Sequence, residues 1–168
     1  MFAINEFVIH TTGGICQVQN IAPLDMPGAD KNRKYYFLTP IKTSGGKVFV
    51  PVDNDRTIRK VLTGDEAWEL IDEIPEIEEM KVDNEKQREN LYKEAIKSCD
   101  LRELVSVMKN LYSRREKRLS EGKKTTATDD KYFKIAEDNL YSELAFAIGR
   151  NKDEMEKIIS SRIEEGDI

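Results

Sequence analysis

Residues that build chemical sites are scarce in this sequence. Its 168 residues include one histidine, two cysteines and one tryptophan. A catalytic triad or a Cys–His pair would depend on His10 alone, which we expect to be an ordinary surface or packing residue. Cys16 and Cys99 lie far apart, with no second Cys or His at ligand spacing, which predicts two reduced thiols.

Long hydrophobic runs and glycine-rich nucleotide motifs are also missing. No apolar stretch is long enough to span a membrane, and the N-terminus lacks the basic and apolar regions of a signal peptide. There is no P-loop and no GxGxxG motif, because Gly13-Gly14 and Gly45-Gly46 indicate turns between strands. We therefore expect a cytoplasmic protein with no membrane partner, no cofactor and no metal.

Charged residues, by contrast, are abundant and unevenly distributed. They make up 35% of the chain, and the net charge is −5. Residues 1–63 have eight Lys or Arg against five Asp or Glu, whereas residues 64–168 have nineteen against twenty-seven. The sign changes where the pattern of strands ends, which predicts a boundary near Thr63. Because affinity for a polyanion depends on cations that displace counterions, the acidic second half should contact nucleic acid only locally.

Residues 1–62 have the pattern of a small antiparallel β module. Short runs rich in strand formers alternate with turns that contain Gly or Pro. The runs are residues 7–10, 15–21, 34–39 and 48–52. Four or five short strands in about 60 residues are typical of a Tudor-like or SH3-like fold.

The last of these runs lies within the stretch from Gly45 to Asn54, where we expect a partner to bind. It follows an expected turn at residues 43–46 and ends where Pro51 and Asp53 disrupt regular pairing. Alternation divides its side chains into two faces. The valines of the core-facing set are Val48, Val50 and Val52, and the outward set is Lys47, Phe49 and Pro51.

Residues 63–168 show the periodicity of about five helices. Thr63 and Glu66 form a capping-box pattern at the first helix start, and Gly149 is placed to end the fourth helix. The later helices are predicted to start at Asp83 or Asn84, Asp100, Thr128 and Asn151. The clearest apolar stripe comprises Leu101, Leu104, Val105, Met108, Leu111 and Tyr112. The sequence thus predicts an α+β protein, with a β domain at 1–62 and a compact all-α domain at 63–168.

Two features of the helical half have a structural and a functional interpretation. An acidic run at residues 72–79 fits no calcium loop and is typical of a solvated helix end, although a hydrolase that pairs carboxylates remains an alternative. Trp68 is expected in the core or between domains, and the alternative is an exposed contact for a partner.

A basic segment stands out in the acidic half. Residues 109–124 carry seven Lys or Arg against two Glu, which is +5 in a half that is otherwise −13. Such a cluster offers contacts for phosphates, but cations also complement the dipole at a helix C-terminus and aid solubility. The cations are Lys109, Arg114, Arg115, Lys117, Arg118, Lys123 and Lys124.

Three segments of this chain together resemble a known family. The first is FVIHTTGGICQV at residues 7–18, and the second is VFVPVDN at 48–54. The third is the helical run from NLY at 90–92, through LREL at 101–104, to ELA at 143–145. In their order these segments resemble the CarD family of bacterial transcription regulators. The resemblance covers nearly the whole chain and is greatest to members found in clostridia and related Firmicutes.

The resemblance implies a non-enzymatic regulator that acts as a monomer. Its N-terminal domain would be a Tudor-like RNA-polymerase-interacting domain, similar to one in the transcription-repair coupling factor, and would dock on the polymerase β subunit partly through its sheet edge. Its C-terminal helices would approach promoter DNA at the upstream edge of the melted bubble. The family stabilises open promoter complexes, notably at ribosomal RNA promoters.

The family's contact positions map onto two sets of residues. The polymerase-binding set is Lys47, Val48, Phe49, Val50 and Pro51, and the DNA-binding set is Arg88, Arg114, Arg115, Arg118, Lys123 and Lys124. Glu85 stands where well-described members carry a tryptophan that wedges at the bubble edge, and an acid there repels DNA. Phe49 stands where they carry an arginine. These departures keep open an alternative, an adaptor that binds polymerase or another protein without contacting DNA.

Overall fold

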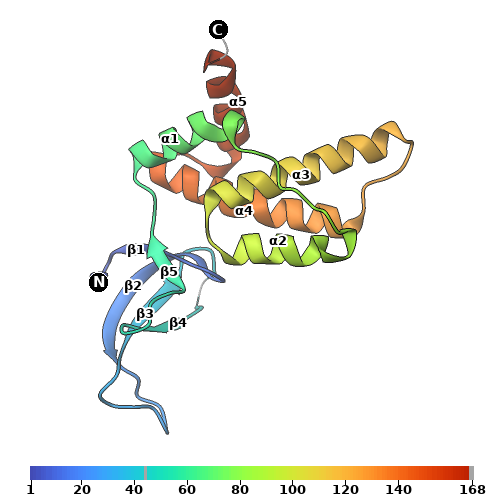
Figure 1. The fold of residues 1–168 in the computed structure, drawn as a ribbon. Helices are drawn as coiled ribbons and strands as arrows, with labels where there is room; N and C mark the ends of the chain where they lie inside the picture. The colour runs from blue at the N-terminus through green and yellow to red at the C-terminus, as the bar shows by residue number, and fades with distance from the viewer. Residues whose placement is uncertain (44, 167–168) are drawn as a thin grey trace. The chain divides into compact units, whose positions relative to one another are not determined.

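The computed structural model describes residues 1–43 and 45–166, so Ser44, in the expected turn at 43–46, lies outside the described residues. The chain divides into two compact units, Met1–Val61 and Leu62–Ile168 (Figure 1). No helix in the described ranges is long and apolar enough to cross a membrane.

The first unit is a single antiparallel sheet that curls around its own core (Figure 1). Its strands are β1 (Phe7–His10), β2 (Gly14–Pro23), β3 (Lys34–Pro40), β4 (Val48–Pro51) and β5 (Ile58–Lys60). Their order in the sheet is β4-β3-β2-β1-β5, so β4 and β5 form its two edges. The register shifts in β2 between Val18 and Asn20, and such a bulge bends a strand and increases its twist.

The core of the first unit lies on the concave face of the sheet. Alternate residues of neighbouring strands point into it, because successive side chains of a strand face opposite sides. The ring of Phe2 contacts that of Tyr36 edge to face at 5.6 Å, and its amide donates to the Tyr36 hydroxyl at 3.1 Å. The buried residues that form this core are Val8, Cys16, Val18, Tyr36, Leu38, Val50 and Ile58. The predicted Tudor-like β module is confirmed.

The described part of the second unit contains five α-helices and three short 3-10 helices, which confirms the predicted helical domain. The α-helices are α1 (Gly64–Glu73), α2 (Arg88–Lys97), α3 (Leu101–Ser120), α4 (Ala127–Ile148) and α5 (Met155–Gly166). The 3-10 helices are η1 (Ile74–Glu76), η2 (Glu85–Gln87) and η3 (Lys152–Glu154). Pro75 lies in η1, directly after α1, as expected of a residue that cannot continue an α-helix.

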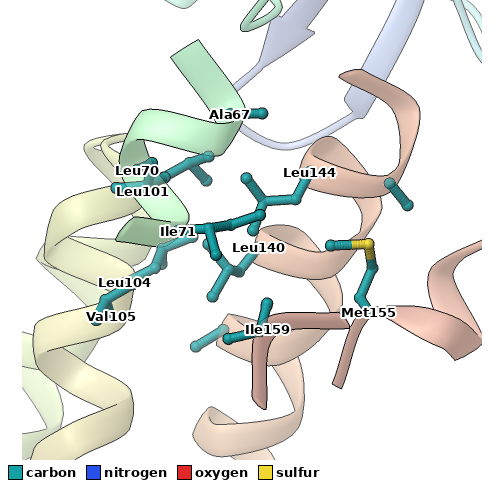
Figure 2. Packing of buried hydrophobic residues seen from close by; sticks show 12 residues of the cluster. Ala67, Leu70, Ile71, Leu101, Leu104, Val105, Leu140, Leu144, Met155 and Ile159 are labelled. Carbon is teal, nitrogen blue, oxygen red and sulfur yellow. The ribbon is translucent and has the colours of Figure 1, made fainter. Parts of the chain in front are cut away.

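Two apolar clusters hold these helices together. In the larger one, side chains of α1, α3, α4 and α5 converge, among them Ile71, Leu104, Leu144 and Met155, all with 2% or less of their surface exposed (Figure 2). In the smaller one, Tyr92 of α2 meets residues of α3 and α4. Helix α4 contacts all four of the others and is the centre of the unit.

Capping residues delimit the helices much as the sequence predicts. The Thr63–Glu66 capping box is present at α1, and Asn84 and Asp100 cap η2 and α3. The last helical segment also begins after Asn151, as predicted, although the side chain of Asn151 makes no capping hydrogen bond. One start was predicted wrongly, because Thr126, rather than Thr128, caps α4.

The predicted apolar stripe of α3 is correct except at its end. Leu101, Leu104, Val105 and Leu111 are buried and Met108 is half-buried, but Tyr112 is 59% exposed. Conversely, Val107 and Tyr92 are fully buried although neither was predicted to face inward.

Substitution of Gly149 tests whether the end of α4 requires a left-handed backbone conformation. It has a φ of +70° and a ψ of 36°, and a Cβ placed there would meet no heavy atom within 4 Å. Gly149→Ala should therefore lower the free energy of unfolding by about 1–2 kcal/mol through left-handed strain alone. Gly149→Asn is the matched variant, since Asn tolerates this conformation, and it should cost less. Chemical denaturation measures both, and equal losses would contradict a conformational cause.

Candidate functional site

Strand β4 offers an open sheet edge. It pairs with β3 only, with Phe49 opposite Phe37 and Val50 opposite Tyr36. The amide of Val52 donates to the carbonyl of Lys34 at 3.0 Å. Because the ladder alternates, the backbone N–H and C=O of Phe49 point away from β3, and no other strand of the described residues pairs with that side. The edge can therefore accept a strand from a partner.

The outward face beside this edge is aromatic. The side chain of Phe49 is 41% exposed, and its ring packs edge-on against that of Phe37, with the centroids 5.1 Å apart. On the same face the Arg33 guanidinium lies 5.6 Å from the centre of the Tyr35 ring and pairs with Asp53 at 3.0 Å. A partner here would meet apolar surface with a neutralised ion pair at its border.

The five residues of the predicted polymerase-binding set divide by orientation. Val50 is 3% exposed, and Val48 packs against the core of the first unit, so both hold the strand in the sheet. The exposed Lys47, Phe49 and the half-buried Pro51 are left to face a partner. This division agrees with the alternation read from the sequence.

The predicted DNA-binding residues of the second unit do not form one surface. Arg88 and Arg114 both point at Asp129 of α4, which is only 7% exposed. The Arg114 Nε donates to Asp129 Oδ2 at 2.7 Å, and Arg88 Nη1 donates to Oδ1. Glu85 of η2 lies 3.2 Å from both guanidinium groups. These four residues form an ion network within the unit.

Electrostatics keep this network ionised. Burial alone would raise the pKa of Asp129, but hydrogen bonds from Arg88 and Arg114 outweigh it and lower that pKa below its usual value. Burial alone would likewise lower the pKa of Arg88, and hydrogen bonds to Tyr92 and Asp129 raise it instead. Because a buried charge without its partner destabilises a protein, Arg88 and Arg114 serve to stabilise the helical unit by pairing with Asp129.

The other four cations, which we call the basic patch, gather near the C-terminal end of α3. They are Arg115, Arg118, Lys123 and Lys124. Arg118 Nε donates to the carbonyl of Lys124 at 2.8 Å, which ties the following loop to the helix. Lys123 pairs with Glu121 at 3.2 Å, and Arg115 and Lys124 are exposed.

The sequence does not reveal the role of Asp129. An acid in the first turn of α4 would complement the helix dipole, whereas this carboxylate is the buried anchor of the network. Glu85 was predicted only to repel DNA, although it balances two arginines. No local pattern distinguishes these acids from their exposed neighbours, so only the spatial contacts identify them.

Carboxylates of the acidic run at residues 72–79 form ion pairs and hydrogen bonds with other helices. Asp72 pairs with Arg162 at 2.8 Å, Glu73 with Arg102 at 2.8 Å, and Glu79 accepts from Ser113 at 2.9 Å. Within the described ranges, no group of three or more His, Cys, Asp or Glu could hold a metal ion. These carboxylates serve to attach α1 and the chain after it to α3 and α5.

Trp68 packs within the second unit. It is half-buried against the larger apolar cluster, and the Arg162 guanidinium lies 5.4 Å from the centre of its ring. Its contacts are those of a residue at the border of the core.

His10 and Cys16 are structural residues of the β1–β2 turn. His10 Nδ1 accepts from the amides of Gly13 at 3.0 Å and Thr12 at 3.3 Å, and burial lowers the pKa of His10. Burial raises the pKa of the Cys16 thiol to about 11, which leaves little thiolate for nucleophilic attack. The turn is thus suited to holding a hairpin together.

Comparison with known protein families gives two matches that together span most of the chain. Residues 2–62 match the family model described as the CarD-like/TRCF RID domain. Residues 69–160 match the one described as the CarD C-terminal domain. No curated protein matches the chain. The first matched range spans nearly the same residues as the β unit, and the second lies within the helical unit.

Replacement of Asp129 tests the ion network. Asp129→Asn keeps the shape but removes the charge between two arginines, and it should lower the free energy of unfolding at pH 7 by about 2–3 kcal/mol, since Glu85 still balances part of the positive charge. The exposed neighbour offers a control: Asp130→Asn should change stability by less than about 0.5 kcal/mol. Equal effects in chemical denaturation would contradict the assigned role.

The difference in stability between the wild-type protein and Asp129→Asn should depend on pH. Because the folded-state pKa of Asp129 is lowered, its contribution is present above the unfolded pKa of about 3.9 and is lost as the pH falls through the folded value. The stability difference between wild type and Asp129→Asn should therefore shrink as the pH falls below about 4. A difference independent of pH would exclude ionisation of Asp129 as its source.

Proposed function

The chain belongs to the CarD family, and we propose that it is a non-enzymatic transcription regulator that docks on the β subunit of RNA polymerase in the bacterial cytoplasm and changes the stability of open promoter complexes. Family membership supports the coarser statement, a transcription-associated protein that interacts with RNA polymerase. The open edge of β4, in the domain that matches the polymerase-interacting family, is the observation on which the docking proposal rests.

Docking would proceed by strand addition. The backbone groups of Phe49 on the outer edge of β4 would pair with a strand of the β subunit, and main-chain hydrogen bonds of this kind supply affinity with little sequence specificity. Specificity would come from the outward side chains, with Phe49 inserted into an apolar site. Charge pairing would contribute little, because Lys47 is the one cation of the predicted set.

Contact with DNA would be confined to the basic patch. Arg88 and Arg114 are held by Asp129 and Glu85, so the cations left for phosphates are those near the end of α3. A few phosphate contacts give weak affinity with a shallow dependence on salt. We therefore propose that DNA is engaged only when the polymerase already holds the promoter, near the upstream edge of the bubble.

The regulatory effect would follow from differential binding. A factor shifts the ratio of open to closed complexes only by the difference in its affinity for the two. A tenfold preference for the open complex changes that ratio tenfold, which corresponds to about 1.4 kcal/mol. This preference would arise if the basic patch reaches DNA in the open complex alone, and ribosomal RNA promoters are the targets proposed from the family.

A second candidate is an adaptor that binds polymerase without contacting DNA. The engagement of Arg88 and Arg114 in the ion network favours it, as does the acid at position 85. Fluorescence anisotropy of the labelled full-length protein with RNA polymerase, in the presence and in the absence of promoter DNA, separates the two. An affinity for polymerase that promoter DNA leaves unchanged supports the adaptor, and an affinity that promoter DNA increases, by a factor that falls with salt, supports the regulator.

Phe49 tests the docking strand. Phe49→Asp places a charge on the outward apolar face and should abolish co-purification with the polymerase β subunit, a loss of at least about tenfold in affinity. Met26→Asp is the matched control, because Met26 is 59% exposed in the same unit but lies in the loop between β2 and β3. Thermal unfolding checks that both variants fold. If Phe49→Asp binds β as wild type does, β4 is not the docking strand.

The basic patch has its own test. The double variant Arg115→Glu and Lys124→Glu should shorten the lifetime of open complexes several-fold without changing affinity for the β subunit, because each reversed charge removes a phosphate contact. Lys97→Glu with Lys157→Glu changes the net charge equally on α2 and α5 and should leave the lifetime unchanged. Equal shortening by both double variants would attribute the effect to net charge rather than to the patch.

A further inference from the structure

An apolar groove opens on the surface of the second unit. It lies among α3, α4, α5 and the chain that follows α1, and its cavity volume is about 350 Å³. Met108 and Tyr112 of α3 line it together with Phe133 and Tyr141 of α4. A volume of this size holds two or three large side chains. The groove takes no part in the surfaces proposed above for polymerase or DNA.

Tyr112 marks this groove as a contact surface. Met108 and Tyr112 are four residues apart, so they lie one above the other on the same face of α3. The side chain of Tyr112 is nevertheless 59% exposed, because it lines the groove instead of the core. An exposed tyrosine over an apolar groove presents a large, rigid contact area that loses little conformational entropy when a partner covers it.

Glutamates beside the groove outnumber the one cation among the described residues that line it. This cation is Lys109, and its ammonium group donates to the backbone carbonyls of Ile74 and Ile77. Glu79 lines one side. On the other side, burial and the charges of Glu137 and Glu156 raise the pKa of Tyr141, a residue of the lining, to about 12.

Lys152 opposes part of the charge on that second side. It acts on Glu137, but its ammonium group pairs with Asp138. The glutamates beside the groove thus favour a basic occupant over one with phosphates or carboxylates.

The backbone of an occupant is also constrained. The groove is lined mainly by helices, whose backbone amides bond within each helix, and the carbonyls of Ile74 and Ile77 are engaged by Lys109. An extended segment would bury amide groups here without partners, whereas a helix satisfies its own. The lining residues of α3 extend from Val105 to Ser113, which matches about two turns of a docked helix.

We propose that this groove binds an amphipathic helix of a partner protein, with large apolar side chains at positions i and i+3 or i+4 and with lysine or arginine beside them. Tyr112 is the central contact, and the glutamates at the border select the basic flanks. The site does not depend on the docking of β4, so failure of the β-subunit experiments would leave it standing.

The test uses the full-length protein and a labelled synthetic peptide of about four helical turns, with leucines on one face and lysines beside them. A second peptide carries glutamates in place of the lysines. Fluorescence anisotropy should show binding of the lysine peptide and an affinity for the glutamate peptide that is at least about tenfold weaker. Equal binding of both peptides, or of neither, would overturn the proposal.

Matched variants locate the binding. Tyr112→Ala should weaken the lysine peptide at least about tenfold. Leu119→Ala should not, although Leu119 is 49% exposed on the same helix, because it does not line the groove. Glu156→Lys should weaken the lysine peptide and strengthen the glutamate peptide, whereas Glu164→Lys on the same helix should do neither. An equal response to both members of either pair would place binding elsewhere.

A second copy of the chain is the competing occupant. Sedimentation of the wild-type protein should show a monomer at the concentrations used for peptide binding. A dimer that Tyr112→Ala dissociates and Leu119→Ala does not would overturn the proposal in favour of self-association.

Discussion

The helical unit depends on the need to neutralise a buried carboxylate. Asp129 lies near the start of α4, and α4 contacts the four other α-helices. A carboxylate at 7% exposure stays charged only if cations and hydrogen-bond donors replace its water. Arg88 from α2 and Arg114 from α3 supply both, so one charge fixes how two helices approach a third. Glu85 then balances the surplus positive charge.

This arrangement also determines what remains on the surface. Of the cations predicted to bind DNA, Arg88 and Arg114 are held in the ion network, and Lys109 of the same basic segment donates to backbone carbonyls. The predicted set is thereby reduced to a small basic patch near one end of α3. Because affinity for a polyanion requires cations that can displace counterions, most of the surface of the helical unit is better suited to proteins than to nucleic acid.

In the β unit, the feature that matters is the edge of β4, which the fold leaves open. Native sheets protect their edges with short strands, charged residues and proline, and β4 has all three: four residues, Lys47 before it and Pro51 at its end. Only the central part around Phe49 can pair with another strand. An edge of this kind resists aggregation yet accepts one matching partner, whose apolar contact with Phe49 and Phe37 would be insensitive to salt.

Local signals in the sequence determined much of this protein. The alternation of Val48, Phe49 and Val50 set the two faces of β4, and the Thr63 capping box and Gly149 delimited helices, because each depends on residues only a few positions away. A resemblance in several segments, later matched by two family models, identified the family.

Features that depend on contacts between residues far apart in the sequence were decided only by the tertiary structure. Arg88 and Asp129 are 41 residues apart, so no sequence window could show that this arginine is unavailable to DNA. Tyr112 continued the apolar period of α3 and was expected in the core, but the core ends before it because α4 and α5 leave a groove there. Periodicity states which face of a helix is apolar, whereas the neighbouring helices decide how far along that face the core extends.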